Sequence, residues 1–391
     1  MQDIVILSAA RTPIGAFQGS LASLSATDLG AKALAAAATR AGIEPDHLQQ
    51  VYMGCVLPAG LGQAPARQAA IGAGCPTSTG ALTLNKVCGS GMRAVMAAAN
   101  DLRCDDFELV AAGGMESMSR APYLAPGVRD GLRLGEGRLI DSMIHDGLWD
   151  AYKDIHMGSC AELCAKHYEF SREEQDAFAI ESYRRAQAAV EEGRFESEIV
   201  PIDVPQRRGD PIAVTADDEP GRANFDKMPK LRPAFDKQGT ITAANASTIN
   251  DGAAALVLTT ATGASKLGRQ PIARVVAHST FAHQPEWFTT APVNAIRQVL
   301  DRAGVGVGDV DLFEINEAFA VVTMAAIREL DLDPERVNVN GGAVALGHPI
   351  GASGARILVT LLHAMEQRDA RRGCAAICLG GGEATAVLVE R

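Results

Sequence analysis

The stretch Arg40-Ala41-Gly42-Ile43 ends an alanine-rich helical run and is followed by Glu44-Pro45-Asp46. A similar stretch, Arg302-Ala303-Gly304-Val305, ends a second helical run much later in the chain. When the spacing between these two stretches is added to the position of Cys88, it leads to a position beside a glycine-flanked histidine. The same spacing leads from a first strand that ends in glycines to the neighbourhood of a second. Three landmarks therefore recur in one order, which indicates an ancient duplication of one structural unit.

Each half of the chain alternates short apolar runs with helical patterns. Short apolar runs are typical of buried strands, so the alternation favours an α/β fold with mixed or parallel sheets covered by helices. The strands are expected at residues 4–9, 109–112, 253–258, 274–277 and 375–379, and the helices at 33–40, 92–102, 295–303 and 355–365.

A region of different character separates the two halves. Ser171-Arg172-Glu173-Glu174 has the spacing of a capping box and predicts a helix that runs to Gly193. Residues 201–239 are rich in proline, glycine and charge, which predicts a long irregular excursion, either functional or a flexible surface insertion. We expect residues 1–120 with 245–268 to form an N-terminal half, 121–244 a loop domain, and 269–391 a C-terminal half.

Composition narrows the class of protein. The net charge of −11 argues against a nucleic-acid partner, and the sequence contains no apolar run long enough to predict a membrane span. The N-terminus runs directly into a strand-like segment without a basic leader, so we expect a cytoplasmic protein. The eight cysteines form no C-x-x-C pair, which predicts neither a disulfide framework nor a metal site.

Cys88 lies in the stretch Asn85-Lys86-Val87-Cys88-Gly89-Ser90-Gly91-Met92-Arg93, directly before a predicted helix. The helix dipole and free amides at such a position lower a thiol pKa and favour the thiolate. Gly89 and Gly91 remove side chains that would block a substrate carbonyl. Taken alone, the pattern fits a buried turn cysteine equally well.

His348 is flanked by Gly347 and Pro349 within the glycine-rich stretch 338–354. A rigid turn of this kind presents an accessible imidazole, which can act as a general base near neutral pH. A lone histidine is more often structural, but the density of glycines here favours the reactive interpretation.

Two further elements carry polar or reactive groups at strand ends. Cys378 ends an apolar strand before Gly380-Gly381-Gly382, where Gly380 offers an unobstructed N–H to a developing oxyanion. A buried strand cysteine is the structural alternative. Asn316, in the stretch 314–320, could hold a water or a carbonyl oxygen, or could cap the helix that follows.

These four elements together, in this order and spacing, resemble the thiolase family. The resemblance covers essentially the whole chain, from Ser8-Ala9-Ala10-Arg11-Thr12-Pro13 through Gly113-Gly114-Met115-Glu116-Ser117 to Asn250-Asp251-Gly252-Ala253. It implies a thiolase fold, in which two duplicated halves form a five-layer α/β/α/β/α core with an inserted loop domain. It also implies dimers and, in the short-chain biosynthetic members, homotetramers, with residues 121–138 as the expected tetramer contact.

The resemblance implies a role for each element. Cys88 takes the acyl group as a thioester, His348 activates that thiol, and Cys378 removes and returns the α-proton of the second acetyl-CoA. Asn316 orders a water that completes one oxyanion hole with the histidine, and the backbone amides of Cys88 and Gly380 form the other. The implied reaction is the reversible Claisen condensation of two acetyl-CoA to acetoacetyl-CoA and CoA, with coenzyme A as substrate and no separate cofactor.

The stretch His156-Met157-Gly158 resembles the short-chain biosynthetic variant, in which the methionine narrows the acyl pocket. Residues 221–227 do not match the segment that contacts the nucleotide in the family, and Arg222 and Lys227 are expected to replace its phosphate contacts. The tail from Gly382 to Thr385 lacks a glycine that is common in the family, and we expect no loss of catalysis from this difference. For the apolar members of the coenzyme A set, core packing is the alternative. The full set expected to bind coenzyme A is Leu148, His156, Met157, Arg222, Lys227, Phe235, Ala243, Ala246, Ser247, Ala318 and Phe319.

Three other functions are alternatives to the condensation of two acetyl-CoA. A broader 3-ketoacyl-CoA thiolase of a degradative pathway would differ in the chain length it accepts. A carrier-protein-dependent ketoacyl synthase typically pairs its cysteine with two histidines, so Cys378 and Asn316 speak against it. A non-catalytic acyl-CoA-binding relative is improbable because the whole reactive set is present.

Overall fold

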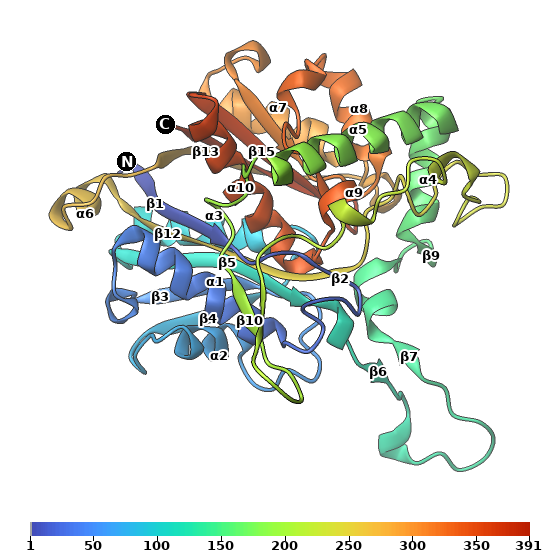
Figure 1. Ribbon diagram of the computed structural model, residues 1–391, viewed down its shortest axis with the longest axis horizontal. Coiled ribbons are helices and arrows are strands. Elements are labelled where there is room, and N and C mark those ends of the chain that lie inside the picture. The colour runs from blue at the N-terminus through green and yellow to red at the C-terminus, as the bar shows by residue number, and fades with distance from the viewer. Residues whose placement is uncertain (1) are drawn as a thin grey trace.

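The computed structural model describes residues 2–391, and its core is a ten-stranded mixed sheet (Figure 1). The strands follow the order β14-β15-β16-β13-β1-β12-β5-β3-β4, with β2 paired to β12. Their bounds are β1 Ile4–Arg11, β2 Gly15–Ala16, β3 Gln50–Gly54, β4 Gly80–Leu84, β5 Leu109–Ser117, β12 Asn250–Thr260, β13 Ala273–Ala282, β14 Leu312–Ile315, β15 Arg372–Leu379 and β16 Glu383–Glu390.

The strand order repeats itself, which confirms the duplication. In the N-terminal half β1 and β12 are antiparallel, β12 and β5 are antiparallel, and β5 and β3 are parallel. In the C-terminal half β13, β16, β15 and β14 follow with the same pattern of directions. Among the described strands, those of the two halves pair with each other only where β1 runs antiparallel to β13, from Ile4–Val275 to Ile6–Ala273.

Helices cover both halves and also fill the space between them, so the expected five layers are present (Figure 1). Helices α1 and α2 share one apolar cluster with the N-terminal strands, and α7 shares another with the C-terminal strands. A third cluster surrounds α3 and α10, which lie between the two halves of the sheet. The bounds are α1 Ala26–Ala41, α2 Pro65–Gly72, α3 Ser90–Arg103, α7 Ala291–Ala303, α8 Ala320–Leu330 and α10 Ile350–Gln367.

The repeated helix ends have one physical cause. Helix α1 stops at Gly42 with φ of 64°, and α7 stops at Gly304 with φ of 68°. In this left-handed conformation a glycine backbone N–H satisfies the last carbonyls of the helix without the steric cost of a Cβ atom.

The two central helices approach closely at glycine positions. A Cβ atom on Gly91 would lie 2.8 Å from the backbone nitrogen of Ala355, and one on Gly354 would lie 2.5 Å from that of Met92. Because α3 and α10 each begin two residues after a candidate reactive residue, this packing draws the Cys88 and His348 turns together.

The stretch between β5 and β12 lies outside the main sheet. Helix α5 begins with the predicted capping box, in which Ser171 and Glu174 bond reciprocally, and it ends at Glu191. The rest of the stretch is mostly irregular, and the segment between β6 and β7 projects from the body (Figure 1). Its other elements are β6 Tyr123–Leu124, β7 Ile140–Asp141, a π-helix at Met143–Leu148, β8 Trp149–Asp150, β9 Ile155–His156, α4 Met157–His167, β10 Ile202–Val204 and β11 Ile212–Val214.

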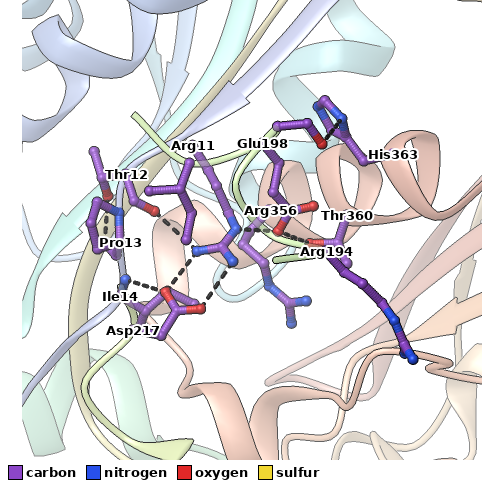
Figure 2. A network of polar contacts seen from close by, with 12 residues as sticks. Arg11, Thr12, Pro13, Ile14, Arg194, Glu198, Asp217, Arg356, Thr360 and His363 are labelled. Atoms are coloured by element: carbon purple, nitrogen blue, oxygen red, sulfur yellow. Dashed lines mark hydrogen bonds and ion pairs between the residues drawn. The ribbon is translucent and has the colours of Figure 1, made fainter. Parts of the chain in front are cut away.

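A buried polar network fastens this stretch to the core (Figure 2). Arg11, at the end of β1, is fully buried and donates to Glu198 at 2.5 Å and to both oxygens of Asp217 at 2.7 and 2.9 Å. Asp217 also accepts from the backbone N–H of Ile14, and Glu198 from Thr360 of α10. Burial opposes the charge on Arg11, but the two carboxylates outweigh it and raise the pKa of its guanidinium.

The expected strands at 4–9, 109–112 and 253–258 all lie inside longer ones. Strand β5 continues through Gly113 and Gly114 to Ser117, because these glycines serve close packing rather than a turn. A Cβ atom on Gly113 would lie 2.0 Å from the carbonyl oxygen of Ala254, and one on Gly114 would lie 2.2 Å from that of Gly351. Over residues 2–391, no helix combines the length and apolarity that a membrane crossing requires.

Candidate active site

The Cys88 turn is strained and held by hydrogen bonds. Val87 has φ of 45°, which is costly for a branched side chain and persists only when its surroundings enforce it. Its N–H donates to the side chain of Asn85 at 3.0 Å, and its carbonyl accepts from the Ser90 hydroxyl at 2.6 Å. Ser90 also accepts from Lys86 N–H at 2.8 Å. Sequence reasoning did not single out Ser90, although it braces this turn.

The glycines beside Cys88 act differently from the prediction. A Cβ atom on Gly89 would lie 2.2 Å from the Leu379 side chain, and Gly91 faces the backbone of Ala355. Both glycines therefore permit packing of the turn against β15 and α10. The prediction that they clear a path for the substrate carbonyl was wrong, because both positions face the core.

The hydrogen bonds of His348 determine its tautomer. Its Nδ1 lies 2.6 Å from the Ser353 hydroxyl, which in turn donates to the carbonyl of Pro349 at 2.9 Å. Since that hydroxyl has only one proton, it must accept at Nδ1, so Nδ1 carries the hydrogen. Nε2 is then a free lone pair, and within residues 2–391 no protein group bonds to it. The backbone N–H of His348 is fixed by Asn250 at 2.9 Å.

The reactive residues from both halves meet on one cavity of about 270 Å³. Cys88, His348, Cys378 and Gly380 all line it. Eight of the expected coenzyme A residues do so as well, namely Leu148, His156, Met157, Phe235, Ala246, Ser247, Ala318 and Phe319. Sequence reasoning missed six further lining residues, which are Met118, Gly147, Thr248, Ile249, Phe288 and Ile350.

Aromatic side chains build one wall of the cavity. His156 stacks on Phe235 with ring centres 4.7 Å apart, and its Nδ1 accepts from the N–H of Gly158 at the start of α4. Phe235 also meets Phe319 edge to face. Ser247 donates from its hydroxyl to the carbonyl of Ala318 at 2.9 Å, which ties the remaining part of the wall together.

Four predicted residues do not line the cavity. Asn316 is buried, and within the described chain its side-chain nitrogen and oxygen have no protein partner. Neither atom therefore caps the helix that follows. Ala243 is exposed on the segment that leads to the cavity wall. Arg222 and Lys227 are exposed as well, with Arg222 3.9 Å from Glu219.

Comparison with known proteins identifies this arrangement. Residues 4–262 match the model of the thiolase N-terminal domain, and residues 269–391 match that of the thiolase C-terminal domain. The chain belongs to the thiolase family. An acetyl-CoA acetyltransferase of Cupriavidus necator is 53% identical, with both chains covered completely. A mitochondrial acetyl-CoA acetyltransferase B of Xenopus laevis is also 53% identical over the whole of this chain and 92% of its own.

A solved thiolase has the same fold. The crystal structure of the Acat5 thiolase from Ascaris suum in complex with coenzyme A superposes with a TM-score of 0.95. It is 47% identical in sequence, and each chain is covered completely. The five-layer architecture described above is thus the thiolase fold.

Burial shifts the pKa of each reactive group of this thiolase towards its neutral form. Burial raises the pKa of the Cys88 thiol to about 12, although the N–H groups of Gly380 and of Cys88 itself oppose the rise. Burial, with the charge of Arg356, lowers the pKa of His348 to about 3. The expectation of a lowered Cys88 pKa was wrong, because burial of the thiol outweighs the two backbone hydrogen bonds that oppose it. The pKa of Cys378 is also raised by burial, and further by Cys88.

Glu116, which sequence reasoning missed as a site residue, supports this arrangement from behind. Its carboxylate accepts from the N–H groups of Val56 at 2.9 Å, Leu57 at 3.2 Å and Gly351 at 2.9 Å. It thereby joins β5 to the first turn of α10, next to His348. Burial raises its pKa to about 7 despite these hydrogen bonds, and its charge contributes to the raised pKa of Cys88.

The pH dependence of Cys88 alkylation tests the neutral pair. Because the thiol pKa is raised to about 12, the thiolate fraction keeps growing as pH rises towards that value. We expect the rate of iodoacetamide modification to increase from about pH 6 to 10 without a plateau. The background should carry Cys104→Ser, because that thiol is exposed. A plateau with a midpoint below about pH 8 would instead show a resting thiolate–imidazolium pair.

Proposed function

We propose that this thiolase is an acetyl-CoA C-acetyltransferase that forms acetoacetyl-CoA from two acetyl-CoA through an acetyl-Cys88 intermediate, and cleaves it in reverse. The observation that carries the proposal is the meeting of two thiols and one imidazole, with its Nε2 free, on a single cavity. The names and identities of the acetyl-CoA acetyltransferase relatives support it.

In the first step the sulfur of Cys88 attacks the thioester carbonyl of acetyl-CoA while His348 Nε2 takes the thiol proton. The free lone pair that the Ser353 hydrogen bond enforces suits this role. The N–H groups of Cys88 and Gly380, which both act on the Cys88 thiol, are the proposed donors to the developing oxyanion. Departing CoA takes a proton from Cys378, which leaves Cys378 as a thiolate and His348 protonated.

In the second step the Cys378 thiolate removes the α-proton of another acetyl-CoA, and the enolate attacks acetyl-Cys88. A thiol whose pKa is raised by burial is a strong base once it is deprotonated, which suits removal of a weakly acidic C–H proton. The unpartnered side chain of Asn316 is available to order a water near the enolate oxygen. Cys88 leaves as a thiolate and recovers its proton from His348, which completes the cycle.

The direct test is CoA-dependent loss of acetoacetyl-CoA, followed at its enolate absorbance, beside longer 3-ketoacyl-CoA substrates. We expect acetoacetyl-CoA to be cleaved with the highest kcat/KM. Comparable values on medium-chain substrates would overturn the acetyl specificity and favour the broader degradative thiolase.

Met157 is expected to limit the acyl chain length. It lines the cavity, and its Sδ and Cε atoms lie 3.8 Å from where a Cβ atom on Gly380 would be. We expect Met157→Ala to raise the ratio of kcat/KM for 3-ketohexanoyl-CoA to that for acetoacetyl-CoA by about tenfold or more, since each methylene accommodated is worth about 1–3 kcal/mol. Met324→Ala, on α8 and outside the cavity, is the control. An unchanged ratio would show that Met157 does not limit the acyl chain length.

The segment that projects between β6 and β7, residues 125–139, is proposed to join two dimers into a homotetramer. Its apolar side chains are unusually exposed for a single chain, with Leu134 fully exposed and Leu139 69% exposed. We expect Leu132→Ser with Leu134→Ser to convert the tetramer to a dimer, as measured by light scattering after gel filtration. The exposed Leu267→Ser, on the far end of the molecule after α6 (Ala261–Lys266), is the control. A tetramer that survives the double change would place the contact elsewhere.

A further inference from the structure

The two amides proposed to hold the oxyanion come from turns in different halves of the chain. Cys88 belongs to the strained turn before α3, and Gly380 begins the turn between β15 and β16. That second turn consists of three glycines, of which Gly381 and Gly382 have φ of 90° and 81°. A Cβ atom on Gly381 would meet nothing within 4 Å, so few side-chain contacts restrain the middle of this turn.

Apolar packing joins the two turns on their buried side. Leu379 packs under Gly89, and the position of a Cβ atom on Gly380 is 3.4 Å from the Val87 side chain. Thr385 adds a contact from its hydroxyl to the sulfur of Met92 on α3. The apolar contacts set the separation of the turns but are non-directional, so they restrain the position of one turn along the other less than a directional contact does.

A charged contact joins the turns on their outer side. Lys86 Nζ bonds a carboxylate oxygen of Glu383. Lys86 lies two residues before Cys88, and Glu383 lies three residues after Gly380, as the first residue of β16. The two side chains are only 24% and 33% exposed, and neither lines the cavity. The pair thus spans the same two turns that supply the oxyanion donors.

We propose that the Lys86–Glu383 ion pair is a positioning contact that fixes the N–H groups of Cys88 and Gly380 relative to each other for acyl transfer. The inference rests on the proposed function, because it assumes that these amides receive the oxyanion. An oxyanion hole works only when its donors are preorganised, and a displacement of under an ångström weakens it. The N–H of His283 holds the far side of the glycine turn by donating to the carbonyl of Gly382 at 2.9 Å, and the ion pair restrains the turn on the side that faces Cys88.

A positioning role makes a specific kinetic prediction. Lys86→Met and Glu383→Gln should each lower kcat by about three- to tenfold, with KM changed by less than about twofold, because the contact acts in the transition state. The double removal should be no worse than either single change, since both break one contact. The exchanged pair, Lys86→Glu with Glu383→Lys, should recover at least about half of the lost kcat. Melting temperature should barely change, because a partly exposed pair adds little stability.

The assay should use whichever 3-ketoacyl-CoA the wild type turns over fastest, so that an error in the proposed chain length cannot affect the result. Failure of the proposed chemistry would show separately, as activity that survives Cys88→Ala. The control is the distant ion pair of Lys266 with Glu108, changed in the same way, which should leave kcat unaltered.

Three results would overturn the proposal. Single variants with kcat within about twofold of wild type would show that packing alone positions the amides. Losses that multiply in the double variant, with no recovery in the exchanged pair, would show that the residues act separately. A raised KM in Lys86→Met that Glu383→Gln does not share would show that Lys86 instead contacts the anionic substrate.

Discussion

Cys88→Ala and Cys378→Ala are each expected to lower kcat/KM for acetoacetyl-CoA cleavage by about 10³-fold or more, because each removes a reacting group that nothing else on the cavity replaces. Both thiols line the cavity with His348, and no other cysteine of residues 2–391 does. The two variants should fail differently. Cys378→Ala keeps the nucleophile and should accumulate an acetyl group on Cys88 when incubated with acetyl-CoA, whereas Cys88→Ala should not be acetylated.

Mass spectrometry of the intact protein separates these outcomes, and Cys374→Ala is the matched control. Cys374 lies on β15 with Cys378 and is equally buried, but it packs in the outer C-terminal cluster rather than on the cavity. It should retain turnover within a few-fold of wild type. Acetylation that persists in Cys88→Ala, or near-normal turnover in either cavity variant, would contradict the two-cysteine mechanism.

Asp217→Ala is expected to lower the free energy of unfolding by about 3–5 kcal/mol, the usual cost of breaking a buried ion pair on one side. The change leaves Arg11, which is fully buried, with Glu198 as its remaining counter-charge (Figure 2). It also leaves the N–H of Ile14 without its side-chain acceptor. The protein cannot avoid the cost by neutralising Arg11, because the pKa of a guanidinium is far above neutral pH.

Denaturant unfolding followed by circular dichroism measures this cost, and Asp203→Ala is the control. Asp203 is a nearby carboxylate on β10 whose side chain is exposed, so its loss should change stability by less than about 0.5 kcal/mol. A change below about 1 kcal/mol in Asp217→Ala would show that water or Glu198 compensates the buried charge.

Local features of the sequence predicted much of the fold. The Arg-Ala-Gly endings located two equivalent helices, because glycine is favoured wherever a helix stops in the left-handed conformation, and Gly42 and Gly304 both do so. The capping box at Ser171 likewise located the start of α5. Strand ends were less predictable. In β5, Gly113 and Gly114 suggested the end of the strand, but the strand continues to Ser117 because a neighbouring backbone takes the place of side chains at both glycines.

The sequence by itself determined which residues could react and that the chain repeats one unit, because a thiol before a helix, a glycine-flanked imidazole and a cysteine before three glycines are all local patterns. Only the tertiary structure decided their chemical state. Burial favours the neutral forms of Cys88 and His348, and Ser353 fixes the histidine tautomer. The close crossing of α3 and α10 brings both residues to one cavity. Desolvation and helix crossing depend on segments far apart in the chain, so no local pattern could have revealed them.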